Sequence, residues 1–490
     1  MQHDWLPDQI VYQIFPDRFA IGGGLSPEQK MRSPAYPPGV HRKAWHDRPE
    51  QPPHGRDFFG GDLPGIIEKI EYLHALGVTC VYLTPIFHAS SNHKYDTIDF
   101  HAVDPMFGTL ADFDRLLAAL HARGMRLVLD AVFNHVGDHH PWYAGRHRDP
   151  RLAGYFLKID GREQFWRGHR HLPELDVDNP ELEEFLWRGR DSVVRWWLDR
   201  GIDGWRFDTA PDLGLPFIRR LAAAIRPAYP DRVMWGEVTN FPGADWTGPD
   251  RYDGVMNYYC RTAVHGFADG GLTAREAGES LAEYVREMGL PAALRSLLIL
   301  SSHDTPRLMT GLHDDEARVR LAMTLQFALP GIPMIYYGEE NGMAGGADPD
   351  NRRPMVWEPH GWRHGIREHL LRLTDLRRRR PEWRRGGFTD LTARIDGKVL
   401  AFMRTGAQPG EFTLIAANAT DRPVTARLVV PYAHLYDGVR LVDLLGHGRH
   451  FTALGGRVDV EVPPKTALAL APDGRCIEGF HFYKPRNRLG

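Results

Sequence analysis

The stretch RLVLDAVFNH, residues 126–135, begins as an apolar run and ends in polar side chains. A segment with helical spacing of its apolar residues precedes it, and the same unit recurs through the first 380 residues. Such alternation indicates parallel βα units. The expected strands span residues 10–15, 78–83, 126–131, 202–207, 232–236, 254–257, 297–301 and 332–337. Eight strands favour an α/β protein built as a (β/α)8 TIM barrel, although the count alone leaves an open doubly wound sheet as an alternative.

Two helical segments have clear boundary signals. In the first, Asp62 is the expected N-cap, an apolar stripe runs to Leu76, and Gly77 follows. The second runs from Asp112 to Gly124, with apolar residues repeating at three and four positions. Both stripes are predicted to pack on the barrel.

Two longer segments interrupt the βα rhythm. Residues 136–199 follow the third strand and far exceed a usual βα loop, so we expect an inserted domain that covers the barrel mouth as a lid. From residue 386 the apolar residues alternate, which predicts a C-terminal antiparallel β-sandwich over 386–475. The barrel then comprises 1–135 and 200–385, and the tail, 476–490, follows no period.

Composition excludes several classes of protein. Sixty Lys and Arg against 63 Asp and Glu give a net charge of −3, so no whole-chain field attracts nucleic acid or anionic lipid. The basic run Arg377–Arg380, with Arg384 and Arg385, is typical of a helix C-terminus, which favours cations. The three cysteines form no CxxC pair and predict neither a disulfide framework nor a zinc site. With neither a leader pattern nor a membrane span, we expect a cytoplasmic protein.

Polar motifs follow four of the expected strands. They are DAVFNH (130–135), GWRFD (204–208), GE (236–237) and SSHD (301–304). The C-terminal strand ends of a TIM barrel form one rim, so side chains far apart in sequence converge there. The residues expected at this mouth are Asp208, Glu237, Asp304, Arg206, His135 and His303.

Paired carboxyl groups at one mouth fit glycoside hydrolysis, which needs a nucleophile or base and a protonated acid. Arg206 is expected to hold Asp208 ionised through its positive charge. Glu237 stands between a glycine and a valine, which suits an apolar pocket that keeps it protonated. Asp304 would add negative charge and further disfavour ionisation of Glu237.

A divalent-metal site is the competing interpretation of the same acidic and histidine residues. The sequence contains no HExxH, no DxDxDG loop and no HxH at a strand end, so we predict no catalytic metal. It also lacks GxSxG, GxGxxG and a P-loop, which argues against a serine hydrolase and a nucleotide-binding protein.

Taken in order, and with GIPMIYYGEE (331–340) after the eighth strand, these motifs resemble the α-amylase family of glycoside hydrolases. Five further segments are similar to its maltodextrin glucosidase, cyclomaltodextrinase and neopullulanase group. They are VYQIFPDRF (11–19), FFGGDLPGI (58–66), SNHKYDT (91–97), LPELD (172–176) and DPDNRRPMVW (348–357). The resemblance covers about residues 5–470.

The resemblance implies retaining hydrolysis of α-1,4-glucosidic bonds in maltooligosaccharides, and also in cyclodextrins or pullulan, through a covalent glucosyl-enzyme. Asp208 would be the nucleophile, Glu237 the acid/base and Asp304 the transition-state stabiliser. The implied substrate-binding residues are Tyr95, Asp96, His135, Arg206, His303, Asp348 and Arg352. Among them, Tyr95 would stack beneath the sugar ring, and Asp348 and Arg352 would bind the next sugar on the non-reducing side. No cofactor is required, and calcium is compatible with the resemblance but not implied by it.

Three departures from the group leave alternatives open. VYQIFPDRF begins at Val11, so we expect no N-terminal dimerisation domain, and the oligomeric state stays open. After Glu237 the sequence has Val238–Asn240, where the group places aromatic or histidine residues. After Asp208 it has Thr209–Pro211, where many secreted amylases have lysine and histidine. A transglycosylating or sucrose- or trehalose-directed α-glucosidase is therefore the first alternative. A non-catalytic glucan-binding protein is the remote one.

Overall fold

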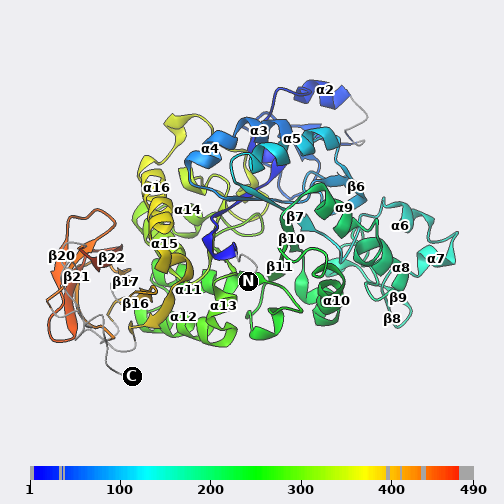
Figure 1. Ribbon diagram of the computed structural model, residues 1–490. Coiled ribbons are helices and arrows are strands. Elements are labelled where there is room, and N and C mark those ends of the chain that lie inside the picture. Colours follow the sequence, from blue (N-terminus) through cyan, green and yellow to red (C-terminus); the bar gives the residue numbers. More distant parts are fainter. Residues whose placement is uncertain are drawn as a thin grey trace.

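The predicted strands close into a parallel barrel (Figure 1). This computed structural model describes residues 5–32, 36, 39–392, 398–408, 411–431 and 438–473. The strands are β1 (Val11–Ile14), β4 (Cys80–Leu83), β7 (Arg126–Ala131), β10 (Gly204–Phe207), β11 (Val233–Val238), β12 (Gly254–Asn257), β13 (Leu297–Ile299) and β14 (Ile332–Tyr336). Since β1 pairs in parallel with both β4 and β14, the sheet has no edge, which confirms the TIM barrel over the open sheet.

Alternating side chains of the barrel strands face two different cores. Val11, Tyr82 and Trp235 belong to a cluster that fills the barrel interior. Tyr12 and Val81, their neighbours in sequence, belong to the layer between the sheet and the helices. Both faces of the sheet are thus buried, which explains why these strands are apolar throughout.

The helices around the barrel follow the predicted order, with two differences in detail. The segment from Asp62 to Leu76 forms two short helices, because the backbone leaves the helical region at Lys69. Asp62 is the N-cap, as predicted, and accepts the Gly65 N–H at 2.8 Å. The second helix begins at Leu110, because Thr109 and Asp112 form a capping box.

The main helices of this layer are α3 (Leu63–Glu68), α4 (Ile70–Ala75), α5 (Leu110–His121), α9 (Val193–Arg200), α10 (Ala210–Ile225), α11 (Tyr258–Asp269), α12 (Ala274–Met288), α15 (Glu316–Ala328), α16 (His364–Arg379) and α17 (Pro381–Arg385). None of the helices in the described ranges combines the length and apolar character needed to cross a bilayer.

The segment inserted after β7 projects from one side of the barrel (Figure 1). Its elements are α6 (Pro141–Gly145), α7 (Pro150–Ala153), β8 (Lys158–Ile159) and β9 (Arg162–Glu163). The end of the predicted 136–199 domain instead packs on the barrel helices. Trp187 contacts Phe217 of α10 with ring centroids 4.7 Å apart, and Trp197 contacts Phe113 of α5 at 4.9 Å. These two tryptophans place the last part of the segment, including most of α9, in the helical layer.

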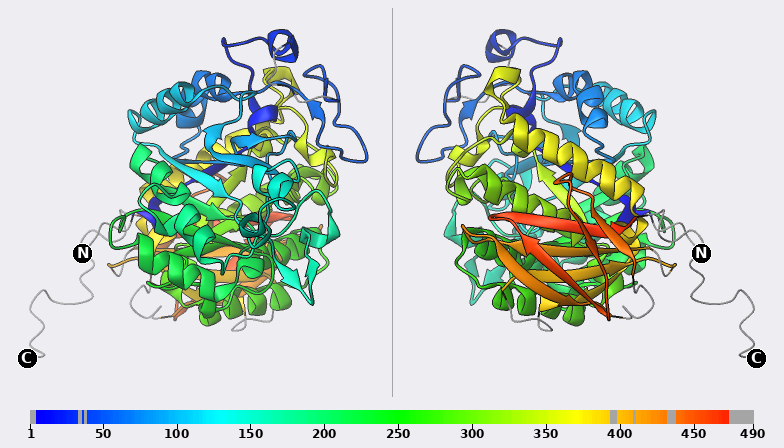
Figure 2. Two further views of the ribbon diagram at one scale, coloured as in Figure 1. Left: turned by 90° about the vertical axis from the view of Figure 1, so that its right-hand side faces the viewer. Right: turned by 90° about the vertical axis from the view of Figure 1, so that its left-hand side faces the viewer.

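The C-terminal domain lies on the opposite side of the barrel from the inserted segment (Figures 1 and 2). One sheet contains β15 (Gly387–Asp390), β16 (Leu400–Thr405), β17 (Phe412–Asn418), β22 (Thr466–Pro472), β19 (Arg440–Asp443) and β20 (His450–Thr452). The other pairs β18 (Val424–Val429) with β21 (Arg457–Val462). Their inward side chains share one apolar core, which agrees with the predicted sandwich. The tail, 476–490, lies outside the described residues.

His140, at the start of the inserted segment, makes stability depend on pH. Its Nδ1 caps α6 by accepting the Trp142 N–H at 3.2 Å, and burial lowers its pKa from 6.5 to about 4. Between those values the unfolded chain binds more protons at this residue, so the contribution of His140 to the free energy of unfolding falls by about 1.4 kcal/mol per pH unit as the pH drops from 6.5 to 4.

We expect His140→Asn, which keeps a capping acceptor and cannot titrate, to reduce the loss of the free energy of unfolding between pH 7 and pH 5, measured by urea titration. Other buried histidines, such as His265 and His369, keep their share of the acid sensitivity. The control is His139→Asn, which replaces a side chain that is 72% exposed. An equal acid sensitivity in His140→Asn and the unmodified protein would contradict the assignment.

Candidate active site

One buried guanidinium lies at the centre of the barrel mouth. Arg206 Nη1 contacts Asp130 Oδ1 and Asp208 Oδ1, each at 2.7 Å, and its Nη2 is 2.9 Å from Glu237 Oε1. Asp130 and Glu237 are the next-to-last residues of β7 and β11, and Asp208 directly follows β10, so these carboxylates converge at the C-terminal strand ends, as predicted. Asp130, the first residue of DAVFNH, was not among the predicted site residues. Nothing in its own strand indicates that it contacts the same arginine as Asp208.

Glu237 lies in polar surroundings, so the prediction of an apolar pocket is wrong. Its contact with Arg206 is an ion pair without hydrogen-bond alignment. Its Oε2 accepts the Thr209 N–H at 3.0 Å, and its Oε1 accepts the Tyr258 hydroxyl at 3.2 Å. The environment of Glu237 is formed by Arg206 on β10, by Thr209 just after β10 and by Tyr258 at the start of α11, and not by its sequence neighbours Gly236 and Val238.

Three carboxylates share one cation in a water-poor site, and this disfavours ionising all of them. Burial raises the pKa of Asp208 well above its usual range, the Arg206 charge lowers it, and Glu237 and Asp130 raise it again. The predicted ion pair between Arg206 and Asp208 is present, at 2.7 Å, but burial and the two neighbouring carboxylates oppose its effect on the pKa of Asp208. The cluster instead favours retention of a proton.

Tyr95 and His303 form a hydrogen-bonded pair beside this cluster. The Tyr95 hydroxyl lies 2.9 Å from Asp130 Oδ2 and 2.6 Å from His303 Nε2. On its other side, His303 Nδ1 lies 2.9 Å from Gln13 Nε2. Burial, with Arg352 and Arg206 nearby, lowers the pKa of His303 well below its usual range, so the ring is neutral. Gln13 lies on β1, inside the motif VYQIFPDRF, but the sequence did not predict it as a site residue.

His135 lies at the end of β7 under the inserted segment. Its ring stacks on Trp166 with centroids 5.3 Å apart, and within the described part of the chain no group bonds its Nε2. Burial lowers its pKa to about 3. A neutral imidazole with an unused nitrogen is suited to binding a sugar hydroxyl.

Asp304 is the most exposed of the three predicted catalytic carboxylates, with 40% of its side chain accessible. Arg352 joins it to Asp348, with Nη2 at 3.4 Å from Asp304 Oδ1 and Nη1 at 3.2 Å from Asp348 Oδ1. These three residues, predicted from two separate motifs, therefore lie in one chain of contacts.

Asp96 has contacts that differ from those of the other predicted substrate-binding residues. Its carboxylate accepts from the backbone N–H and the hydroxyl of both Ser90 and Ser91, and it is buried. Because these donors occupy the carboxylate, we assign Asp96 to holding the loop that carries Tyr95.

Asn351 fixes the loop after β13 that carries His303 and Asp304. Its buried Nδ2 lies 2.7 Å from His303 O, 2.9 Å from Thr305 O and 3.4 Å from Ser302 O. Sequence reasoning missed this residue, since an asparagine inside DPDNRRPMVW does not reveal which carbonyls it will meet.

We expect Asn351→Ala to lower kcat on maltotriose about tenfold with a smaller change in KM, because the loop carboxylate and imidazole lose their fixed positions. Asp350→Ala is the matched control, since it removes an ion pair with Arg353 from the same turn. Similar losses of kcat in both variants would show that Asn351 has no specific positioning role.

Comparison with known proteins gives one consistent result. The model of the alpha amylase catalytic domain matches residues 13–395. Neopullulanase 2 of Thermoactinomyces vulgaris is 37% identical over 417 residues, 82% of this chain and 68% of the relative. The cyclomaltodextrinase of Geobacillus thermopakistaniensis is 33% identical over 479 residues, 94% of this chain and 76% of the relative.

Among solved structures, the cyclic alpha-maltosyl-(1→6)-maltose hydrolase from Arthrobacter globiformis, in complex with that cyclic sugar, superposes with a TM-score of 0.79 at 31% identity. The match covers 96% of this chain and 99% of the other.

Proposed function

The chain belongs to the α-amylase family of glycoside hydrolases, and we propose that it hydrolyses α-1,4-glucosidic bonds of maltodextrins with retention of configuration. The observation that supports this most strongly is the single guanidinium of Arg206 in contact with both Asp208 and Glu237. Retaining enzymes keep their two carboxyl groups about 5 Å apart, whereas inverting enzymes leave room for a water. Two carboxylates on one guanidinium suit the shorter separation.

The first half of the reaction forms a covalent intermediate. The ionised Asp208 attacks the anomeric carbon while Glu237 gives its proton to the glycosidic oxygen, which leaves as a hydroxyl group. For this step Glu237 must carry the proton and Asp208 must be ionised. Thr209 and Tyr258 orient Glu237 for this transfer through their hydrogen bonds.

In the second half, Glu237 takes a proton from water, and the water oxygen attacks the anomeric carbon and displaces Asp208. Both groups return to their starting states. Because these side chains supply the nucleophile and every proton transfer, we propose that the reaction requires no organic cofactor.

The sugar in the reacting position would be held by neutral donors. His135 offers its unused Nε2. Both nitrogens of His303 have partners, so His303 would exchange its hydrogen bond to Tyr95 for one to a sugar hydroxyl. Hydrogen bonds from such donors strengthen as positive charge develops on the sugar. The accessible Asp304 would accept hydrogen bonds from sugar hydroxyls, and Asp348 with Arg352 would contact the adjoining sugar.

We also propose a cytoplasmic location, which the buried free thiols of Cys80 and Cys260 support.

Product analysis tests this function. We expect maltotriose and end-labelled maltoheptaose to be cleaved, with the α-anomer as the first product in the NMR spectrum. Parallel assays with cyclodextrin, pullulan, sucrose and trehalose separate the members of the family. Inactivity on every maltodextrin would refute the assignment, and initial release of the β-anomer would refute retention.

A further inference from the structure

Arg18 is a buried cation that joins two segments far from it in sequence. Its side chain is 1% accessible, and its Nε donates to Asp17 Oδ2 at 2.6 Å. Its Nη1 donates to Arg352 O at 2.8 Å, and its Nη2 donates to Asp57 O at 3.1 Å. Because a guanidinium presents its donors in fixed directions, these bonds hold three parts of the chain against one another.

The first of these segments carries Arg352. Arg18 holds its turn at two points, since Nη1 donates to Arg352 O and the Arg18 carbonyl accepts the Met355 N–H at 2.8 Å. The Arg352 side chain then reaches Asp348 and Asp304. Both carboxylates are partly accessible, whereas Arg18 is not, so Arg18 can act on a sugar only through Arg352.

The second segment connects Arg18 to the loop that carries Tyr95. Asn92, three residues before Tyr95, donates from its Nδ2 to Asp57 O at 2.9 Å and to Asp57 Oδ1 at 2.8 Å. Arg18 and Asn92 therefore share the Asp57 carbonyl. In this way Arg18 anchors the turn of Arg352 to the loop of Tyr95.

Aromatic rings and charge complete the surroundings of Arg18. Its guanidinium lies 4.4 Å from the ring centroid of Phe59, and the Phe15 ring lies 5.5 Å from the guanidinium of Arg18 and from that of Arg352. Burial raises the pKa of Asp348, whereas the charges of Arg352 and Arg18 lower it. Arg18 thus affects the electrostatics of this part of the mouth as well as its geometry.

We propose that Arg18 is a positioning residue for the sugar that adjoins the reacting one on its non-reducing side. By anchoring Arg352 to the loop of Tyr95, it sets the separation of the two sides between which that sugar binds. A site whose groups are already fixed loses less conformational freedom on binding, so a loosened anchor should weaken the contribution of this sugar. The inference rests on the proposed hydrolysis, which places the adjoining sugar at Asp348 and Arg352.

Two substrates isolate the adjoining sugar. p-Nitrophenyl α-maltoside and α-glucoside release the same nitrophenol and differ only in that sugar, so the ratio of their kcat/KM values measures its contribution. We expect Arg18→Lys to lower this ratio about tenfold, while kcat/KM on the glucoside falls less than about threefold. Lysine keeps the charge but lacks the fork that binds Asp17, Asp57 and Arg352 together. An unchanged ratio would overturn the proposal.

A double-mutant cycle tests whether Arg18 acts through Arg352. Arg352→Ala removes the sugar contact itself and should lower the ratio about tenfold or more. In the double variant, Arg18→Lys should then add less than about threefold to that loss. Losses that multiply would mean that Arg18 acts by another route.

Asn92→Ala loosens the same anchor without changing Arg18. It removes both bonds to Asp57, and we expect the ratio to fall about threefold. If circular dichroism showed that Arg18→Lys does not fold, this variant would decide, and an unchanged ratio would again contradict the anchor.

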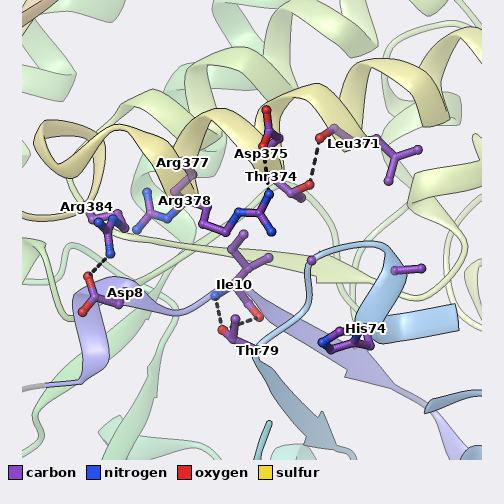
Figure 3. Close-up of a pocket in the computed structure, with 12 residues that line it drawn as sticks. Asp8, Ile10, His74, Thr79, Leu371, Thr374, Asp375, Arg377, Arg378 and Arg384 are labelled. Carbon is purple, nitrogen blue, oxygen red and sulfur yellow. Dashed lines mark hydrogen bonds and ion pairs between the residues drawn. The ribbon is translucent and has the colours of Figure 1, made fainter. Parts of the chain in front are cut away.

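The matched control is a buried arginine at the opposite end of the barrel. Arg377 lines a cavity beside α16 together with Ile10 and Thr79, which precede β1 and β4 (Figure 3). It donates to four backbone carbonyls, so Arg377→Lys should also lower stability, but it should leave the ratio unchanged. An equal fall in Arg377→Lys and Arg18→Lys would show that the ratio follows stability and not positioning.

The same assays separate this inference from the proposed function. Hydrolysis of both glycosides with an unchanged ratio in Arg18→Lys would overturn the inference alone. So would a ratio of about one in the unmodified protein, because the adjoining sugar would then contribute nothing. No hydrolysis of either glycoside or of any maltodextrin would refute the proposed function, and the inference with it.

Discussion

We expect Asp208→Asn to lower kcat on maltotriose by about 10⁴-fold or more while maltodextrin binding persists. The amide oxygen can still accept from Arg206 Nη1, so the arrangement at the mouth should survive. An amide, however, does not attack the anomeric carbon. Steady-state kinetics and calorimetric titration with a maltodextrin measure the two effects separately.

Asp130→Asn is the matched control for this variant. It removes a carboxylate from the same Arg206 nitrogen, but the Asp130 side chain is fully buried and cannot touch a sugar. We expect it to lose about 10²-fold at most, through altered charge at Arg206. Equal losses in the two variants would mean that Asp208 acts through the charge cluster and is not the nucleophile.

We expect Glu237→Gln to lower kcat on maltotriose by about 10³-fold, because the leaving oxygen no longer receives a proton. The first step with α-maltosyl fluoride should be affected much less, since fluoride leaves without protonation. A rapid-quench assay of fluoride release measures that step.

Tyr258→Phe removes the hydroxyl that donates to Glu237 but leaves the Glu237 carboxyl group in place, so it should cost less than tenfold on either substrate. If Glu237→Gln slowed maltotriose hydrolysis and fluoride release equally, Glu237 would not be the general acid.

The barrel could be predicted from sequence because its signals are local. Each strand is a short apolar run, and the polar residue at its end is fixed by the strand itself, so Asp208 and Glu237 could be placed on one rim from spacing alone. The helix N-cap at Asp62 is local in the same sense.

The environment of each site residue could not be predicted, because it comes from other strands. Glu237 meets Tyr258 and Arg206, and His303 meets Gln13 from β1. The presence of Arg206 two residues before Asp208 predicted a positive environment, but the carboxylates of Glu237 and Asp130 add negative charge there. These pairings depend on the register and closure of the barrel, which sequence periodicity does not specify.

The central claim is that Asp208 becomes covalently bound to the sugar. In Glu237→Gln, α-maltosyl fluoride should load the enzyme without acid assistance, and the missing base should then slow hydrolysis of the adduct. Intact-protein mass spectrometry should show the addition of one maltosyl group, and peptide mapping should place it on Asp208. An adduct on another residue, or no adduct together with β-maltose as the first product, would contradict the account.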